Sequence, residues 1–298
     1  MKNFEELLEQ AKLKGMKKIS VACADEAHVL ISVEEARKKG LIEAILVGNK
    51  ENIISVAESL DIDISKYEII DEKDSVEACN KAVNCIVEGK AQILMKGLVD
   101  SSIILRAALK GLRKKDETHS FLSHVAIFEV SGFDRIIFLS DAGMNISPNV
   151  EDKALIIKNT VFAAKRLGIE NPKVAVLAAK EKVDEKMPVT VIAAELEKMN
   201  KDGLISDCIV QGPLALDNAI SMDSVKIKGV KGEVAGKADI LITPNLEAGN
   251  ILYKSLSFFA RAQSAGNIVG AIAPIVLPSR ADTADAKFYS IVLSILLS

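Results

Sequence analysis

Short apolar runs rich in β-branched residues alternate along the chain with longer amphipathic stretches. The amphipathic stretches predict helices at Val33 to Lys39, Asp74 to Glu88, Ala154 to Leu167 and Pro188 to Met199. The apolar runs predict buried strands, namely KKISVACA (17–24), AILVG (44–48), YEIID (67–71), AQILMKG (91–97), RIIFLSD (135–141), KVAVLAA (173–179), CIVQG (208–212), ADILITP (238–244) and NIVGAIAPIVL (267–277). Strands that alternate with helices are typical of an α/β protein with largely parallel sheets covered on both faces.

A length of 298 residues, at about 150 residues per domain, predicts about two domains, and one large α/β domain also fits this length. A dense polar run, GLRKKDETHS (111–120), breaks the alternation and is the predicted first crossing between domains. We place the second crossing near Ala265 to Asn267.

Composition narrows the class of protein. The net charge is only -3, and aromatic residues make up 4% of the chain with no Trp. Because a dedicated nucleic-acid binder needs a basic footprint or stacking aromatics, we expect no nucleic-acid partner. We also expect a soluble, cytoplasmic protein without a membrane partner, because no uncharged apolar run reaches about 18 residues. The cysteines lack zinc-site spacing, which favours reduced thiols and no metal.

Proteins of the α/β class often bind a nucleotide through a glycine-rich loop. GVKGEVAGKAD (229–239) misses the phosphate-loop spacing, and Ala238 stands where the magnesium-binding hydroxyl should be. No GxGxxG follows a predicted strand. Several strands instead end in Gly97, Asp141, Gly212 or Pro244, and the carboxyl ends of parallel strands are where ligands bind.

Two segments of the C-terminal half carry candidate chemistry. In ITPNLEAGNILYKSL (242–256), the chain turns at Pro244 and enters a helix through Asn245, a good N-cap residue. The helix then carries Glu247, Asn250 and Lys254. This polar set is equally compatible with a solvated helix face and with an anion site at the helix start.

The second segment is IAPIVLPSRADTADAKF (272–288). Ser279 and Arg280 follow an apolar strand, and Asp282 or Thr283 is expected to cap the last helix. An arginine beside a hydroxyl at such a turn can hold a tetrahedral oxyanion through paired hydrogen bonds. A structural cap with a surface arginine is the alternative explanation.

Five spaced blocks resemble the phosphate acetyltransferase and phosphate butyryltransferase family. They are MKGLVDSSIILRAAL (95–109), DAGMNISP (141–148), QGPLALDNAI (211–220), AGKADILITPNLEAGNILYKSL (235–256) and PIVLPSRADT (274–283). The resemblance covers about Met95 to Ser290.

The resemblance implies an α/β chain of two domains, similar to isocitrate and isopropylmalate dehydrogenases, with the active site in the cleft between them. One domain would comprise 1–118 with 269–298, and the other, 119–268, would carry the interface of a homodimer or larger homo-oligomer. The implied reaction is reversible transfer of an acyl group between coenzyme A and inorganic phosphate, with both as substrates and no bound cofactor.

The resemblance also suggests roles for individual residues. Arg280 would bind phosphate, and Ser279 would contact the oxyanion or the departing sulfur. The family's catalytic aspartate does not carry over, because its position here is Ala286; Asp282 or Asp285 would replace it as base. The remaining expected cleft residues are Lys96, Gly97, Ser101, Ser102, Asn145, Pro244, Asn245, Glu247, Asn250 and Lys254.

SRADTADAK places the sequence nearer the butyryl-type branch than the acetyl-type branch, which tends to carry SRGCS. We therefore expect a phosphate butyryltransferase, with an acetyl-specific enzyme as the nearest alternative. Two alternatives of other classes are a catalytically silent acyl-CoA or phosphate binding protein and a metal- and NAD-dependent decarboxylating dehydrogenase of the same fold.

Overall fold

The chain forms two compact units in the computed structural model, which describes residues 1–113 and 121–298. The N-terminal unit consists of Phe4–Ser120 with Ala265–Ser298, and the middle unit consists of Phe121–Ser264 with Met1–Asn3. The predicted first crossing, 111–120, lies mostly outside the described residues.

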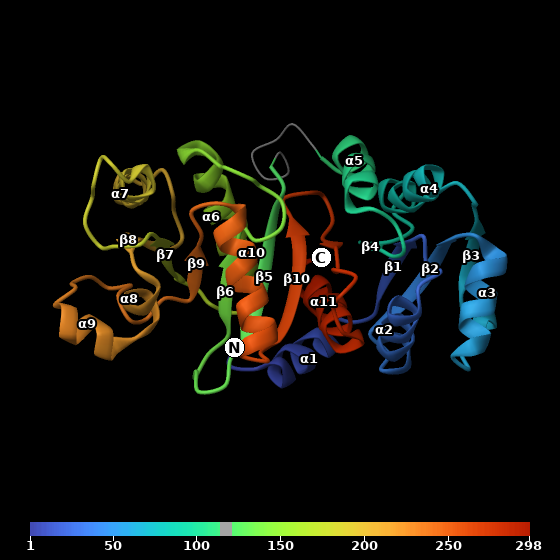
Figure 1. Cartoon of the computed structure of the whole chain (residues 1–298). Helices are drawn as coiled ribbons and strands as arrows, with labels where there is room; N and C mark the ends of the chain where they lie inside the picture. Colours follow the sequence, from blue (N-terminus) through green and yellow to red (C-terminus); the bar gives the residue numbers. More distant parts are fainter. Residues whose placement is uncertain (114–120) are drawn as a thin grey trace. The chain divides into compact units, whose positions relative to one another are not determined.

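The described residues of the N-terminal unit form six strands in the order β3-β2-β1-β4-β11-β10 (Figure 1). Neighbours are parallel except for the antiparallel pair β10 and β11. The bounds are β1 (Lys17–Ala22), β2 (Ile42–Gly48), β3 (Glu68–Asp71), β4 (Ile93–Lys96), β10 (Gln263–Val269) and β11 (Ile275–Val276). The strands β1, β2, β4, β10 and β11 are largely buried, as their near-continuous apolar sequences require, whereas the edge strand β3 is only partly buried.

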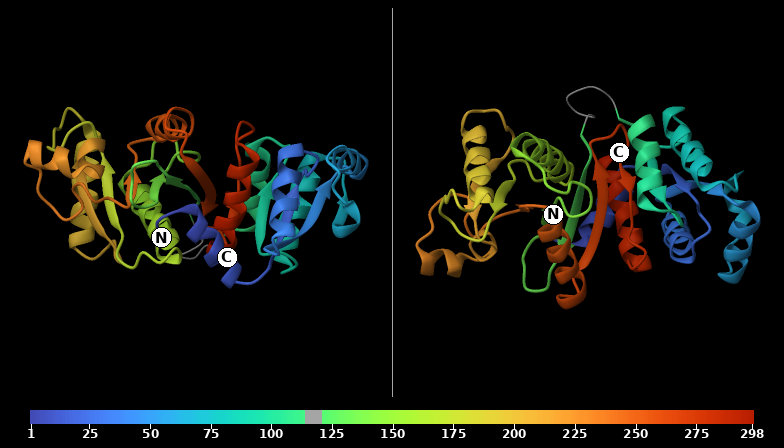
Figure 2. Two further views of the ribbon diagram at one scale, coloured as in Figure 1. Left: turned by 90° about the horizontal axis from the view of Figure 1, so that it is seen from below. Right: turned by 45° about the horizontal axis from the view of Figure 1, so that its top comes forward.

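Helices cover both faces of this sheet. On one face, α11 (Ala284–Leu297) packs against both α1 (Phe4–Leu13) and α2 (Ala27–Lys38); α4 (Ser75–Val87) and α5 (Ser101–Gly111) pack together on the other (Figures 1 and 2). The helix α3 (Lys50–Ser59) and the short helix η1 (Ile64–Lys66) connect β2 to β3. Because α11 is covered by α1 and α2, nearly all of its residues are buried.

The middle unit contains five strands in the order β5-β6-β9-β7-β8, parallel except for the pair β5 and β6. The strand bounds are β5 (Ser123–Glu129), β6 (Ile137–Ser140), β7 (Lys173–Leu177), β8 (Ile209–Leu214) and β9 (Ile240–Ile242). The helix bounds are α6 (Val150–Arg166), α7 (Pro188–Lys201), α8 (Leu216–Ile220), α9 (Met222–Lys228), α10 (Leu246–Lys254) and the π-helical turn η2 (Ser255–Phe259). One apolar core joins Ala219 of α8 and Tyr253 of α10 to the strands.

The predicted α/β class with mostly parallel strands is confirmed. One strand prediction is wrong: NIVGAIAPIVL (267–277) forms two antiparallel strands instead of one. Gly270 adopts a φ of +90°, a left-handed conformation that lets the chain reverse between them. Among the described residues, no helix is both long enough and apolar enough to span a bilayer.

Candidate active site

The strands β4 and β11 bring two distant parts of the chain to one sheet edge. They are parallel neighbours, with Val276 opposite Met95. Both strands end within one residue of that pair, so Lys96 and the loop that starts at Leu277 leave the sheet side by side. Carboxyl ends of parallel strands are the usual place for a ligand site.

A pocket of about 130 Å³ lies at this edge, entirely within the N-terminal unit. It brings together four residues expected from the sequence, Lys96, Gly97, Ser279 and Arg280. The remaining lining residues are Glu26, Val29, Leu98, Pro278 and Lys287.

Two lysines of the pocket are almost fully buried. Lys96 is 4% exposed, and its Nζ donates to the carbonyl oxygens of Gly97 at 3.2 Å and Val99 at 3.1 Å. Lys287 is 2% exposed, and its Nζ donates to the carbonyl oxygen of Asp282 at 2.7 Å. Each lysine therefore fastens one loop of the pocket through backbone carbonyls.

The pocket has a positive electrostatic character. No carboxylate among residues 1–113 and 121–298 forms an ion pair with Lys96, Arg280 or Lys287. Burial lowers the pKa of Lys96, and the positive charges of Arg280 and Lys287 lower it further. Such a group of cations favours an anion that can accept several hydrogen bonds.

The carboxylate of Asp282 is turned back onto its own loop. Its Oδ2 accepts a hydrogen bond from the backbone N–H of Ser279 at 2.8 Å. Thr283, rather than Asp282, caps α11 by accepting from the N–H of Ala286. Asp285 lies exposed in the first turn of α11. The base role expected for Asp282 or Asp285 stays a prediction.

Ser101 and Ser102 lie at the exposed start of α5, directly after β4. The preceding Asp100 caps this helix, because its carboxylate accepts from the N–H of Ser102 at 2.8 Å. Hydrogen bonds from Ser102 lower the pKa of Asp100, and the charges of Arg280 and Lys96 lower it further. Neither serine lines the pocket, although both follow the strand that ends in Lys96.

A second polar cluster lies at the corresponding edge of the middle unit. The strands β6 and β9 are parallel, with Ser140 opposite Ile242. Asp141 is buried directly after β6, and its carboxylate accepts hydrogen bonds from the N–H groups of His124, Gly143 and Met144 and from the side-chain amide of Asn145 at 2.7 Å. The side chain of Asn145 therefore helps to hold this turn in place.

The substrate contacts expected in and before α10 lie in different environments. Asn245 caps the helix by accepting from the N–H of Ala248, and Asn250 donates to the carbonyl oxygen of Ala142 at 3.3 Å. Glu247 is exposed, and Lys254 places its Nζ 5.0 Å from the centre of the Tyr253 ring. Pro244 follows β9 and accepts a hydrogen bond from Lys153. These residues of the middle unit stay predicted substrate contacts.

Sequence reasoning missed Glu26 and Lys287 as pocket residues. Glu26 caps α2 by accepting from the N–H groups of His28 and Val29. The sequence does contain an indication for Lys287. A lysine near the start of an otherwise apolar helix is either buried with hydrogen-bond partners or directed toward solvent.

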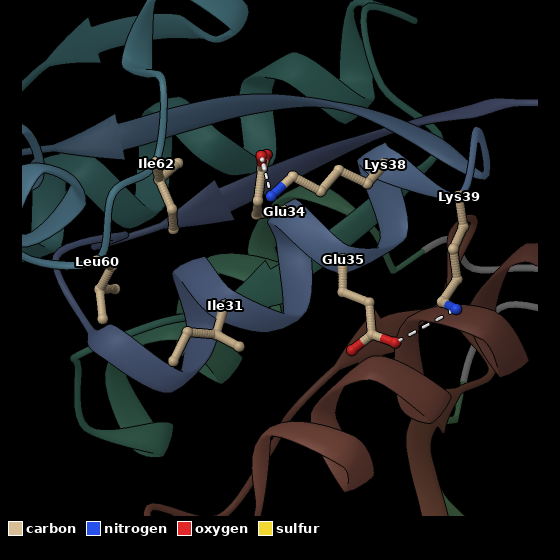
Figure 3. A pocket seen from close by; sticks show the side chains of 7 residues that line it. All are labelled: Ile31, Glu34, Glu35, Lys38, Lys39, Leu60 and Ile62. Atoms are coloured by element: carbon tan, nitrogen blue, oxygen red, sulfur yellow. Dashed lines mark ion pairs between the residues drawn. The ribbon is translucent and has the colours of Figure 1, made fainter.

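A second pocket, of about 450 Å³, is lined by residues of α2 together with Leu60 and Ile62 (Figure 3). Its lysines are already paired, Lys38 with Glu34 and Lys39 with Glu35, in ion pairs of 3.3 and 3.6 Å. The pocket at Lys96 and Arg280 is therefore the better candidate for an anionic substrate.

A family model described as phosphate acetyl/butaryl transferase matches residues 3–81 and 75–295. The chain belongs to this family. It is thus a phosphate acyltransferase, similar to the phosphate butyryltransferase of Clostridium acetobutylicum, with 44% identity over 100% of this chain and 99% of the relative. The phosphate acetyltransferase of Thermotoga maritima is also 44% identical, over 98% of each chain.

Solved structures agree with this family. The acyltransferase matches a branched-chain phosphotransacylase from Enterococcus faecalis V583 with a TM-score of 0.82 and 32% identity, over 95% of this chain and 99% of that one. A 4-hydroxythreonine-4-phosphate dehydrogenase from Klebsiella pneumoniae shares the fold alone, with a TM-score of 0.60 and 12% identity over 94% and 99% of the chains.

Lys153 of the acyltransferase gives a prediction about stability and pH. It is 2% exposed, donates to the carbonyl oxygen of Pro244 at 2.6 Å, and has its pKa lowered by burial to about 8. Between pH 8 and 10.5 the unfolded chain therefore binds more protons at this lysine than the folded chain, so stability rises with pH. We expect this rise to reach at most about 3 kcal/mol relative to Lys153→Met. Urea unfolding of the unsubstituted protein and of Lys153→Met at pH 7.5 and 10 gives the free energy of unfolding of each. If these free energies change by the same amount between the two pH values, the prediction is contradicted.

Proposed function

We propose that this acyltransferase transfers a short-chain acyl group, preferably butyryl, between coenzyme A and inorganic phosphate. The observation that carries the proposal is the pocket in which Lys96, Arg280 and Lys287 meet without a carboxylate partner among the described residues. A phosphate dianion supplies both the charge and the acceptor oxygens that these three cations require.

In this proposal the pocket holds phosphate against the thioester carbonyl. The exposed guanidinium of Arg280 binds phosphate oxygens, and the hydroxyl of Ser279, in the same loop, donates to the oxyanion or to the departing sulfur. Positioning and fixed charges supply most of the rate acceleration, because they favour the negative charge that develops in the transition state. Lys287 keeps the loop in place through the carbonyl oxygen of Asp282.

The preference for butyryl is supported by the names of several relatives. Phosphate butyryltransferases of Clostridium acetobutylicum and Clostridium beijerinckii are 44% and 45% identical to this chain. The equally similar phosphate acetyltransferase of Thermotoga maritima favours the acetyl-specific alternative. The replacement of the family's aspartate by Ala286 agrees with the butyryl type.

The test is release of free thiol from acetyl-, butyryl- and longer acyl-coenzyme A, each with and without phosphate. We expect phosphate-dependent release with the highest kcat/KM for butyryl-coenzyme A. A maximum at acetyl-coenzyme A would support the acetyl-specific alternative. Absence of phosphate-dependent release with every substrate would overturn the proposed function.

A further inference from the structure

Acyl transfer from coenzyme A to phosphate requires that one proton move from phosphate to the departing sulfur. The monoprotonated phosphate dianion attacks the thioester carbon, a carbon–oxygen bond forms and the carbon–sulfur bond breaks. The products are an acyl phosphate dianion and coenzyme A with a free thiol. The proton that phosphate loses is therefore the proton that sulfur gains, and no other acid, base or oxidant is needed for the balance.

We propose that Lys96 relays this proton, accepting it from phosphate and giving it to the departing sulfur. This inference rests on the proposed function and adds a catalytic residue to it. In the opposite direction of the reaction, the same amine takes the proton from the thiol of coenzyme A.

The hydrogen bonds of Lys96 suit a relay. Its Nζ donates to two carbonyl oxygens, those of Gly97 and Val99. A neutral amine has two hydrogens and a lone pair, and an ammonium has three hydrogens. The neutral amine and the ammonium can therefore both donate to the two carbonyl oxygens. The third position on the nitrogen is a lone pair in the amine, which accepts a proton, and an N–H in the ammonium, which donates one. Since Lys96 lines the pocket and is 4% exposed, little bulk water competes for that position.

The charges around Lys96 act on its pKa in opposing directions. Burial disfavours the ammonium, and so do the charges of Arg280 and Lys287. The carboxylates of Glu26 and Asp100 act in the opposite direction. The other titratable neighbours are the thiols of Cys23 and Cys79. A phosphate dianion that enters the pocket raises the proton affinity of the amine, which favours proton transfer only when substrate is present.

The candidate carboxylate bases are less well placed. The Oδ2 atom of Asp282 accepts a hydrogen bond from the N–H of Ser279. Asp285 is exposed and does not line the pocket. Position 286 holds alanine. Lys96 lines the pocket and, with two carbonyl contacts, can change its protonation state without releasing the loop after β4.

Lys96→Arg and Lys96→Ala test the relay, each first checked for folding by circular dichroism and thermal unfolding. Arginine keeps the positive charge but does not give up its proton. We expect Lys96→Arg to keep the KM for phosphate within about threefold while kcat falls by about 10²- to 10⁴-fold, the usual range for a lost acid–base group. The limb of the kcat profile against pH that belongs to Lys96 should also disappear.

Rescue by small amines separates proton transfer from a structural role. Ethylamine should restore part of the kcat of Lys96→Ala, with greater rescue at a pH where more of the amine is neutral. The matched control is Lys153→Ala, which removes another buried lysine bonded to backbone carbonyls and should show no rescue.

The outcomes distinguish the relay from the proposed function. If the unsubstituted enzyme shows no phosphate-dependent thiol release, the proposed function fails and the relay fails with it. If that release is present but Lys96→Arg keeps kcat within about fivefold, or Lys96→Ala loses activity without amine rescue, the relay alone is overturned.

Discussion

Replacing Arg280 by alanine is expected to lower kcat/KM for phosphate by about 100-fold or more, chiefly through a higher KM for phosphate. Arg280 is the exposed cation of the pocket, whereas Lys96 and Lys287 are buried and bonded to backbone carbonyls. Loss of a charge-assisted anchor has an effect of this size. Initial rates of thiol release over a range of phosphate concentrations measure it.

Arg166→Ala is the matched control. It removes an exposed guanidinium from the last turn of α6, which leads toward the amino end of β7 and therefore away from the carboxyl ends of the strands. We expect its phosphate kinetics to equal those of the unsubstituted enzyme. An Arg280→Ala enzyme with the same kinetics as this control would remove Arg280 from the phosphate site.

The substitution Gly97→Ala should destabilise the protein and disturb the pocket at the same time. A Cβ at this position would lie 2.1 Å from the carbonyl oxygen of Cys23 and 2.8 Å from that of Ala22. Both atoms belong to the backbone, so β1 and the loop after β4 would have to separate. We expect the free energy of unfolding to fall by about 3 kcal/mol, at the upper end of overpacking effects, and the KM for phosphate to rise.

Gly89→Ala is the control for Gly97→Ala. It separates the steric clash of the added Cβ from the general effect of replacing a glycine by alanine. Gly89 has a φ of +73°, and no atom lies within 4 Å of the added Cβ. Only the left-handed backbone opposes this change, which costs about 1 kcal/mol. Chemical unfolding and phosphate kinetics of the two variants provide the comparison; equal destabilisation, or unchanged phosphate kinetics in Gly97→Ala, would contradict the expected clash.

The apolar runs predicted most strands because a strand buried on both faces leaves an almost uninterrupted apolar sequence. Two exceptions remain: the strand β5 (Ser123–Glu129) lies in none of the predicted runs, and 267–277 is apolar throughout but is divided at the turn that contains Gly270. A glycine within such a run suits either a strand or a reversal, and the pairing of β10 with β11 decides between them. Local sequence does not contain that tertiary contact.

The candidate site was predicted in part for a similar reason. The SR pair and the MKG block could be recognised as separate loops at strand ends, but their meeting depends on the pairing of β4 with β11. Lys287 was missed because its burial depends on α11 packing against α2, which also contributes Val29 to the pocket. The family resemblance suggests Asp282 or Asp285 as base, whereas the contact of Asp282 with the Ser279 N–H is set by the loop conformation.

The position of β11 between β4 and β10 has a consequence for synthesis on the ribosome. The strands β1 to β4 emerge early, but their sheet cannot gain its next strand until β11 (Ile275–Val276) has been made. The middle unit has all of its strands by then. The candidate pocket, which needs both Lys96 and Arg280, is consequently assembled late, and a nascent chain that stalls before β11 lacks the loop that carries Ser279 and Arg280.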